Sequence, residues 1–106
     1  MYDEPVMSKT LDEMIKAYCA DFLRRAQVIA DKSAPFNVIM EYKFLNYRIY
    51  SAACEMGGAG NALAFITDIG EGRGYANSEL SVMSESVYKI KKREIKLNIA
   101  RRLSLL

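Results

Sequence analysis

The spacing of apolar and polar residues predicts helices along most of this 106-residue chain. Between Thr10 and about Lys32, apolar side chains recur every three or four residues and form one stripe, which is typical of an amphipathic helix. Thr10 and Glu13 have the spacing of a capping box, in which each side chain accepts a hydrogen bond from the other's backbone N–H group. Pro35 disfavours helical geometry in the residue before it, so we expect the first helix to end ahead of it.

A second apolar stripe runs from Val38 to Met56, and it predicts a second long helix. Ser33 or Asn37 is a candidate N-cap, and the pair Gly57-Gly58 is expected to stop the helix. Four aromatic residues fall within nine positions of this helix and cover more than one face: Tyr42, Phe44, Tyr47 and Tyr50. We expect this set to bind other helices or a partner chain rather than water.

A third, shorter helix is predicted from about Asn61, as its N-cap, to Ile69, with Gly70 as its stop. Residues 70–84 are rich in glycine and serine, so we expect a loop with one helical turn near Ser78–Ser81.

The last predicted helix opens at Ser84 or Ser86 and runs nearly to the end of the chain. Ile90 and Leu97 are expected on its flank. Its expected buried stripe consists of Tyr88, Ile95, Ile99 and Leu103.

These patterns together predict an all-α fold of four to five helices. A long antiparallel helix pair is followed by a compact C-terminal helical unit. We expect residues 1–9 to form a flexible N-terminus and residues 10–106 to form a single helical domain, because a chain of this length suits one hydrophobic core.

Composition argues against catalysis and against a bound metal or cofactor. The chain has no histidine, which is the commonest general base and metal ligand. Cys19 and Cys54 are too few for a disulfide scaffold or a four-thiolate zinc site, and we expect both to be buried and reduced. No apolar stretch approaches the roughly 20 residues of a membrane span, and the acidic N-terminus does not resemble a signal peptide. We therefore expect a cytoplasmic protein that does not bind membranes.

The acidic pairs and glycine clusters have simpler explanations than an active site. Asp12-Glu13 lies at a helix start, where capping and the helix dipole explain it. Asp68 and Glu71 are expected in a solvated loop. The cluster Gly57–Gly60 lacks the preceding strand and the Lys-Ser/Thr pair of a phosphate-binding loop. We predict that the protein is not an enzyme and uses no cofactor.

Charge is distributed unevenly along the chain. Residues 85–106 contain seven basic residues and two glutamates, a net charge of +5; since the whole chain carries +2, residues 1–84 carry −3. Most of these basic residues lie in the first half of the last helix, where the helix dipole disfavours cations, and few have an acid four residues away. Such a basic helix attracts polyanions. The expected nucleic-acid-binding residues are Ser84, Ser86, Lys89, Lys91, Lys92, Arg93 and Lys96.

The end of the chain also resembles a known family. The segment from Leu80 to Leu97, with Val87-Tyr88, Lys91-Lys92 and Ile95, is similar to the C-terminal part of small sigma-factor-like regulators of Firmicutes and their mobile elements. These are relatives of the sigma C-terminal DNA-binding module and of phage late-transcription activators. The tyrosine-rich segment 40–49 also resembles such proteins.

This resemblance implies a helix-turn-helix with a recognition helix over residues 84–104. Only four positions separate Leu80 from Ser84, fewer than in the usual module, so the helix-turn-helix would be degenerate. The implied function is non-catalytic DNA binding in transcription regulation, with duplex DNA as the partner. A homodimer would bring two recognition helices to two half-sites.

The alternative is a phage- or mobile-element-encoded adaptor or inhibitor that binds a host nucleic-acid enzyme such as RNA polymerase. In that interpretation the aromatic residues of the second helix would form the partner-binding surface.

Overall fold

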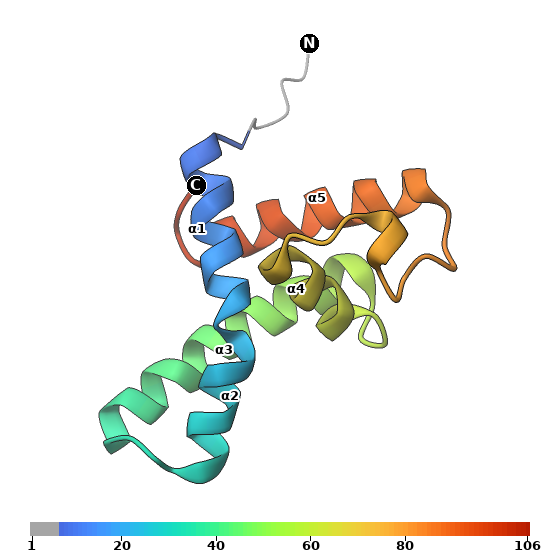
Figure 1. The fold of residues 1–106 in the computed structure, drawn as a ribbon. Helices are drawn as coiled ribbons and strands as arrows, with labels where there is room; N and C mark the ends of the chain where they lie inside the picture. Colours follow the sequence, from blue (N-terminus) through green and yellow to red (C-terminus); the bar gives the residue numbers. More distant parts are fainter. Residues whose placement is uncertain (1–6) are drawn as a thin grey trace.

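The computed structural model describes residues 7–106, and helices make up this part of the chain without any strand (Figure 1). The predicted all-α fold of four to five helices is confirmed. No helix within residues 7–106 has the length and apolar character needed to cross a membrane. The elements in chain order are α1 (Lys9–Ala20), α2 (Phe22–Asp31), α3 (Phe36–Gly57), α4 (Ala62–Glu71), the short 3-10 turn η1 (Tyr75–Asn77) and α5 (Glu85–Arg102).

The first helix begins earlier than predicted. The Ser8 hydroxyl accepts a hydrogen bond from the backbone N–H of Leu11 at 3.1 Å and caps α1, so Thr10 lies inside the helix and the predicted capping box is wrong. Of the predicted flexible N-terminus, residues 1–6 lie outside the described residues. Met7 packs against the core.

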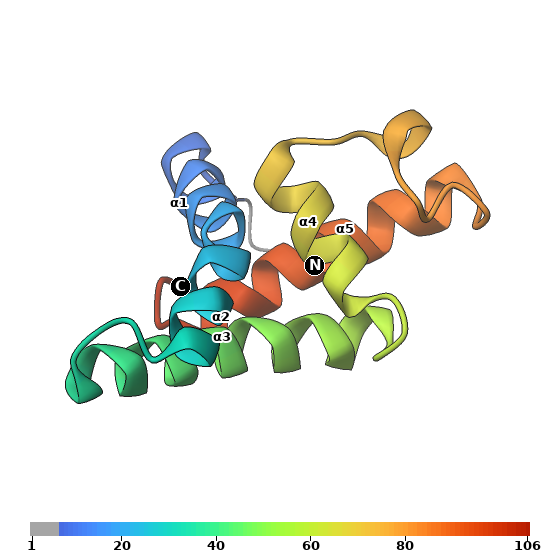
Figure 2. The same ribbon diagram turned by 60° about the horizontal axis from the view of Figure 1, so that its bottom comes forward.

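The predicted helix over residues 10–32 is divided in two at Asp21, which is the cap residue of both halves and has φ −92° and ψ 0°. This bend lets α1 pack against α4 while α2 packs against the first half of α3 (Figure 2). The apolar stripe runs through Asp21 without interruption, so the periodicity contains no sign of the bend.

The close contact between α1 and α4 explains why position 70 is a glycine, although this residue lies inside the helix and does not end it. A Cβ atom on Gly70 would lie 2.6 Å from the backbone nitrogen of Ala20, so only glycine permits this close approach. The predicted stop at Gly70 is therefore wrong. The helix continues to Glu71, and Gly72, with φ +68°, provides the left-handed cap.

The long helix α3 begins at Phe36 after Pro35, so neither Ser33 nor Asn37 caps it, and it ends at Gly57 close to the predicted stop. It runs across the width of the molecule in Figure 2. The last helix, α5, lies antiparallel to its second half. Asn98 donates to the carbonyl of Ala52 at 3.2 Å.

Ser84, one of the two predicted N-caps, is the residue that caps the last helix. The hydroxyl of Ser84 accepts from the backbone N–H of Val87 at 3.3 Å, so α5 begins at Glu85. Tyr88, Ile95 and Ile99 are fully buried, as their spacing predicts. Leu103 packs against the core as a partly buried residue, and Leu97 is buried as well, whereas Ile90 is exposed.

The loop before α5 is anchored by a buried carboxylate. Asp68 accepts hydrogen bonds from the hydroxyls of Ser78 and Tyr88, the latter at 2.9 Å, and it is almost completely buried. The prediction that Asp68 and Glu71 lie together in a solvated loop is therefore wrong for Asp68, which faces inward from α4. A turn forms at Ser78–Ser81 as expected, closed by a 3.3 Å backbone hydrogen bond.

Candidate nucleic-acid interface

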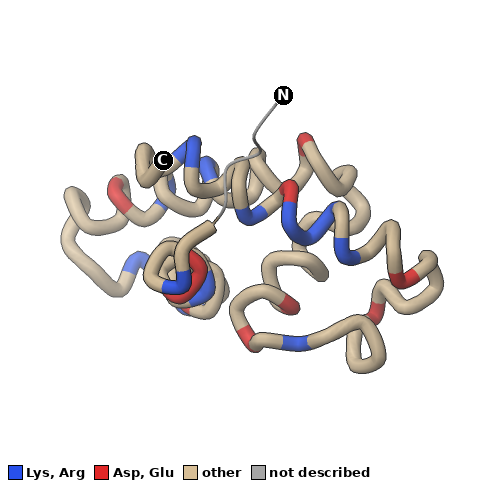
Figure 3. The backbone as a smooth tube through the Cα atoms, turned by 90° about the horizontal axis from the view of Figure 1, so that it is seen from above, with Lys and Arg blue, Asp and Glu red and all other residues tan. Residues whose placement is uncertain are grey.

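A groove of about 700 Å³ lies between α5, the first turn of α1 and the loop at Gly74–Tyr75. Asp12 is the acidic residue among the described residues that line it. Figure 3 shows the basic positions following one another along α5, beside α1, which is seen end-on in this view. Five cationic side chains line the groove: Lys9, Lys89, Lys92, Arg93 and Lys96.

Helix geometry explains why four of these cations share the groove. Residues 89, 92, 93 and 96 are three or four positions apart, so they project from one side of α5. Tyr88 and Ile95, which are buried, hold the adjoining side of these turns against the core, and Tyr88 also lines the groove. Packing of the apolar residues of α5 against the core therefore fixes the direction of these four basic side chains, which project into the groove.

Two of the groove cations are held by the body of the protein. The Lys96 ammonium lies 2.9 Å from a carboxylate oxygen of Asp12 in α1. Lys92 donates to the carbonyl of Arg73 at 2.6 Å and lies 5.6 Å from the centroid of the Tyr88 ring, within cation–π range. Burial, followed by repulsion from Lys96, lowers the pKa of Lys92. These contacts hold Lys92 and Lys96 in place along the wall of the groove.

The other two α5 cations lie further out. Lys89 pairs with Glu85 at 3.1 Å, and both side chains are exposed. Such a surface pair contributes little stability, so a phosphate can replace the carboxylate at small cost. Arg93 is exposed and lines the same groove. Lys89 and Arg93 are therefore the two exposed α5 cations of the groove.

The structure separates three predicted residues from the groove. Lys91 reaches the other side of α5, where its ammonium lies 3.5 Å from the carbonyl of Met56. Ser84 is occupied as the N-cap, and Ser86 is exposed near it, with 3.4 Å between the two hydroxyls. None of the three lines the groove.

Lys9 and Asp12 were missed by the sequence-based prediction. They lie more than seventy positions from α5 in the chain, and only the packing of α1 beside α5 brings them to the groove. The expectation that few basic residues of the last helix have an acidic partner four residues away agrees with the structure, which pairs Lys89 with Glu85 in this way. Other partners come from distant elements, namely Asp12 and the carbonyls of Met56 and Arg73.

The geometry around α5 differs from that of a compact helix-turn-helix. Residues 72–84 separate α4 from α5, whereas the turn of such a motif has about three or four residues. In the second half of α5, residues 97–100 are buried, whereas Arg101 and Arg102 at its end are exposed. In the first half most side chains are exposed or partly buried, and three of the groove cations, Lys89, Lys92 and Arg93, lie there.

The aromatic residues of α3 do not form one surface. Tyr42 is half-buried against α2, where the Arg24 guanidinium lies 5.4 Å from its ring centroid and donates to its hydroxyl at 3.3 Å. Phe44, Tyr47 and Tyr50 are 57%, 69% and 40% exposed. Phe44, Tyr47 and Tyr50 therefore offer the most exposed surface of this set, while Tyr42 contacts another helix, α2.

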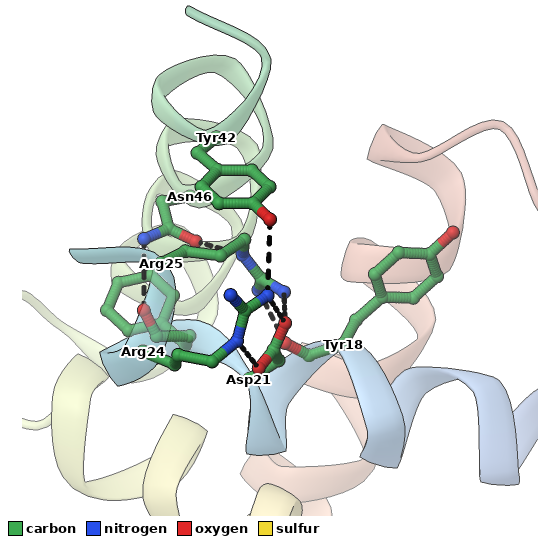
Figure 4. Close-up of polar contacts among 7 residues, drawn as sticks. Tyr18, Asp21, Arg24, Arg25, Tyr42 and Asn46 are labelled. Atoms are coloured by element: carbon green, nitrogen blue, oxygen red, sulfur yellow. Dashed lines mark hydrogen bonds and ion pairs between the residues drawn. The ribbon is translucent and has the colours of Figure 1, made fainter. Parts of the chain in front are cut away.

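A buried guanidinium near the bend at Asp21 serves the fold (Figure 4). Arg25 is 3% exposed, and its burial lowers the pKa of the guanidinium. It donates to the side-chain oxygen of Asn46 at 2.7 Å and to the carbonyl of Tyr18 at 2.5 Å, while Asn46 donates to the carbonyl of Phe22. This network joins α1, α2 and α3 and leaves no donor directed at a ligand in the described residues.

The cysteines do not form a reactive site. Burial raises the pKa of Cys19 to about 12, so its thiol stays neutral and a poor nucleophile at ordinary pH. Within residues 7–106 no three Cys, Asp or Glu side chains gather in a way that could hold a metal ion.

Comparison with protein families, with curated proteins and with solved structures gave no match to this chain.

Proposed function

We propose that this protein is a non-catalytic DNA-binding protein of transcription control, and that it holds duplex DNA by its phosphates across the groove between α1 and α5. The observation that carries the proposal is the convergence of five cationic side chains from two helices on one groove. The proposal places the protein in the cytoplasm with its DNA.

The arrangement of the groove supports phosphate binding in two ways. Lysine and arginine side chains that neutralise phosphates release condensed counterions, and this release is the main source of sequence-independent affinity. The first turn of α1 also lines the groove, so the positive end of that helix adds to the attraction for an anion. With α5 half-buried, we place the duplex along the exposed first half of the helix, with phosphates near Lys89 and Arg93.

The transcriptional part of the proposal rests on the resemblance of residues 80–97 to sigma-like regulators. In that family the corresponding helix meets the major groove. Here the exposed turn containing Ser86 and Lys89 is the part of α5 that could approach base edges, while the groove cations contact the backbone.

The test is fluorescence anisotropy of a labelled mixed-sequence duplex titrated with the protein at several salt concentrations. We compare the wild type with Lys89→Ala/Arg93→Ala. Removing two phosphate contacts lowers the salt slope by about two units and weakens binding at low salt. The matched control is Lys43→Ala/Arg101→Ala, which removes the same charge at exposed positions outside the groove.

Strong loss in the groove variant with little loss in the control is the expected result. Equal loss in both variants would mean that net charge, not the groove, attracts DNA. Absence of binding by the wild type at low salt would overturn the proposal and favour the adaptor acting on a host enzyme such as RNA polymerase.

A further inference from the structure

The basic groove between α1 and α5 also has the size of a small-molecule site. Its volume of about 700 Å³ lies within the range of about 300–1,000 Å³ that is typical of ligand pockets. The charged side chains among its described lining residues are five cations and one carboxylate, with a net charge of +4. Since even the major groove of a duplex is about 12 Å wide, a duplex can only lie across this space, whereas a small anion can enter it.

The two ends of the groove differ in chemistry. At one end, η1 packs beside the start of α5 and places the ring of Tyr75 in the groove wall (Figure 1). At the other end, α1 contributes Lys9 and Asp12, and Asp12 holds Lys96 there at 2.9 Å. Lys89 and Lys96 are seven residues apart on α5, which is about 10 Å along the helix, so one small molecule can reach both ends.

The aromatic end is built around a fixed ring. The hydroxyl of Tyr75 is shared between the carbonyl oxygens of Ser81, at 2.7 Å, and of Met83. Its ring is half-buried and lies 5.5 Å from the ring of Tyr88, measured between centroids. Because these contacts hold the ring of Tyr75 without burying it completely, a planar ligand can stack on it with little loss of side-chain freedom.

Lys92 and Lys96 are the inner cations of the groove. Both are partly buried, whereas the other α5 cations that line it are exposed. An ammonium has three N–H donors. The carbonyl of Arg73 takes one from Lys92 and the carboxylate of Asp12 takes one from Lys96, so the contacts within residues 7–106 leave both with donors for a ligand. Burial and, next, repulsion from Lys96 lower the pKa of Lys92, and an anion beside both ammoniums relieves that repulsion.

We infer that the groove binds a nucleoside polyphosphate, with its base stacked on Tyr75 and its phosphates along Lys92 and Lys96. A ligand of this class joins a planar ring to a chain of negative charges, and so matches both ends of the groove. The inference concerns the same groove as the proposed function, but it rests on the size and the aromatic end of the groove and not on DNA binding. A bound nucleotide occupies lysines that also attract DNA phosphates, so the two ligands compete.

Isothermal titration calorimetry of the full chain with ATP, at low salt and without magnesium, tests this assignment. We expect one ATP to bind per chain. Tripolyphosphate binds about tenfold more weakly because it lacks the stacked base, and adenosine binds more weakly still because it lacks the charge. Absence of ATP binding up to about 1 mM, or tripolyphosphate binding as tight as that of ATP, would overturn the inference.

Two substitutions of Tyr75 separate base stacking from the structure of the loop. Tyr75→Leu and Tyr75→Phe both remove the hydroxyl and its hydrogen bonds, but only Tyr75→Phe keeps an aromatic ring. We expect Tyr75→Phe to keep the tenfold preference for ATP over tripolyphosphate and Tyr75→Leu to lose it. The same tenfold preference in both variants would contradict the placement of the base.

The double variant Lys92→Gln/Lys96→Gln tests the phosphate end. It weakens ATP and tripolyphosphate alike, by about tenfold for each charged hydrogen bond that is lost. The matched control Lys43→Gln/Arg101→Gln removes the same charge at exposed positions outside the groove and changes either affinity by less than about threefold. Circular dichroism verifies that each variant keeps its helices. Equal losses in both double variants would overturn the assignment of the phosphates to the groove.

The titrations contain no DNA, so their outcome is separate from that of the proposed function. A protein that binds ATP but no duplex would keep the nucleotide site and overturn the DNA-binding proposal. A protein that binds duplex but no ATP would keep the DNA-binding proposal and overturn the nucleotide site.

Discussion

The basic groove and the outer face of α3 differ in how the rest of the chain supports them. Around the groove, Lys96 is paired with Asp12, Lys92 donates to the carbonyl of Arg73, and the neighbouring loop is tied to Asp68. On the outer face of α3, large aromatic side chains extend into solvent. The groove cations Lys92 and Lys96 are therefore held in place by the rest of the protein, whereas Phe44 and Tyr47 of α3 remain largely exposed.

This difference also determines which residues can be changed without harm to the fold. Side chains that form the groove wall take part in buried or half-buried networks, so their loss affects stability as well as binding. Exposed side chains on the outer α3 face contribute little to stability.

The groove wall depends on Asp68, and we expect Asp68→Ala to lower the free energy of unfolding by about 2–4 kcal/mol. The substitution leaves the hydroxyls of Ser78 and Tyr88 without their acceptor inside the protein. Urea denaturation followed by circular dichroism measures the change. The contrasting variant Tyr47→Ala, on the α3 face, changes stability by less than about 0.5 kcal/mol when measured at concentrations where the protein is monomeric.

Asp68→Asn serves as the conservative control. Both hydroxyls donate to the same oxygen of Asp68, Oδ2, and the amide oxygen of asparagine can take its place, so the destabilisation is smaller than that of Asp68→Ala. If both Asp68 variants were as stable as the wild type, the network would not be what holds residues 72–84 in place.

The dependence of protein stability on alkaline pH tests the burial of Cys19 and Tyr88. Burial raises the pKa of Cys19 from 9.0 to about 12, and burial together with the Asp68 hydrogen bond raises that of Tyr88 from 10.0 to about 12. The unfolded chain thus loses these protons before the folded protein does. Their contribution to stability is complete below pH 9 and is lost as the pH rises from about 9 to 12.

Urea midpoints at several pH values from 8 to 11 measure this loss. Cys19→Ala and Tyr88→Phe each remove one of the titrating groups, so each variant has a shallower decline than the wild type, whatever its stability at pH 8. Wild-type stability that is the same at pH 8 and at pH 11 would contradict the raised pKa values.

Sequence periodicity predicted the local part of this structure well. The stripe containing Tyr88, Ile95 and Ile99 was correct because the inner face of a helix is encoded by its own residues. The bend at Asp21 and the inward position of Asp68 were not predicted. Both depend on tertiary packing, of α1 against α4 and of the loop against α5, which local patterns do not contain.

The candidate site shows the same limit. The sequence indicated a basic helix and an aromatic helix, but it did not indicate which side chains share a surface. Lys91 and Lys92 are adjacent in sequence yet reach opposite sides of α5, to the carbonyls of Met56 and Arg73. Tyr42 is turned toward α2 although its aromatic neighbours are exposed. Only the positions of the neighbouring helices settle these directions.

The smallest effect comes from the acid inside the groove. Asp12→Asn removes a negative charge from the groove and releases Lys96, so we expect duplex affinity at low salt to increase about threefold. Stability falls by no more than about 1 kcal/mol, because the Asp12–Lys96 pair is partly exposed.

The matched control for Asp12→Asn is Glu13→Gln, because the adjacent exposed residue carries the same charge and does not line the groove. Both substitutions change the net charge and the field of the α1 dipole to a similar extent. A gain in affinity for Asp12→Asn alone would therefore come from the groove, since only there is the carboxylate close enough to compete with a phosphate for Lys96. Equal gains would mean that DNA responds to the charge of the whole molecule, and the groove would lose its distinction from the rest of the surface.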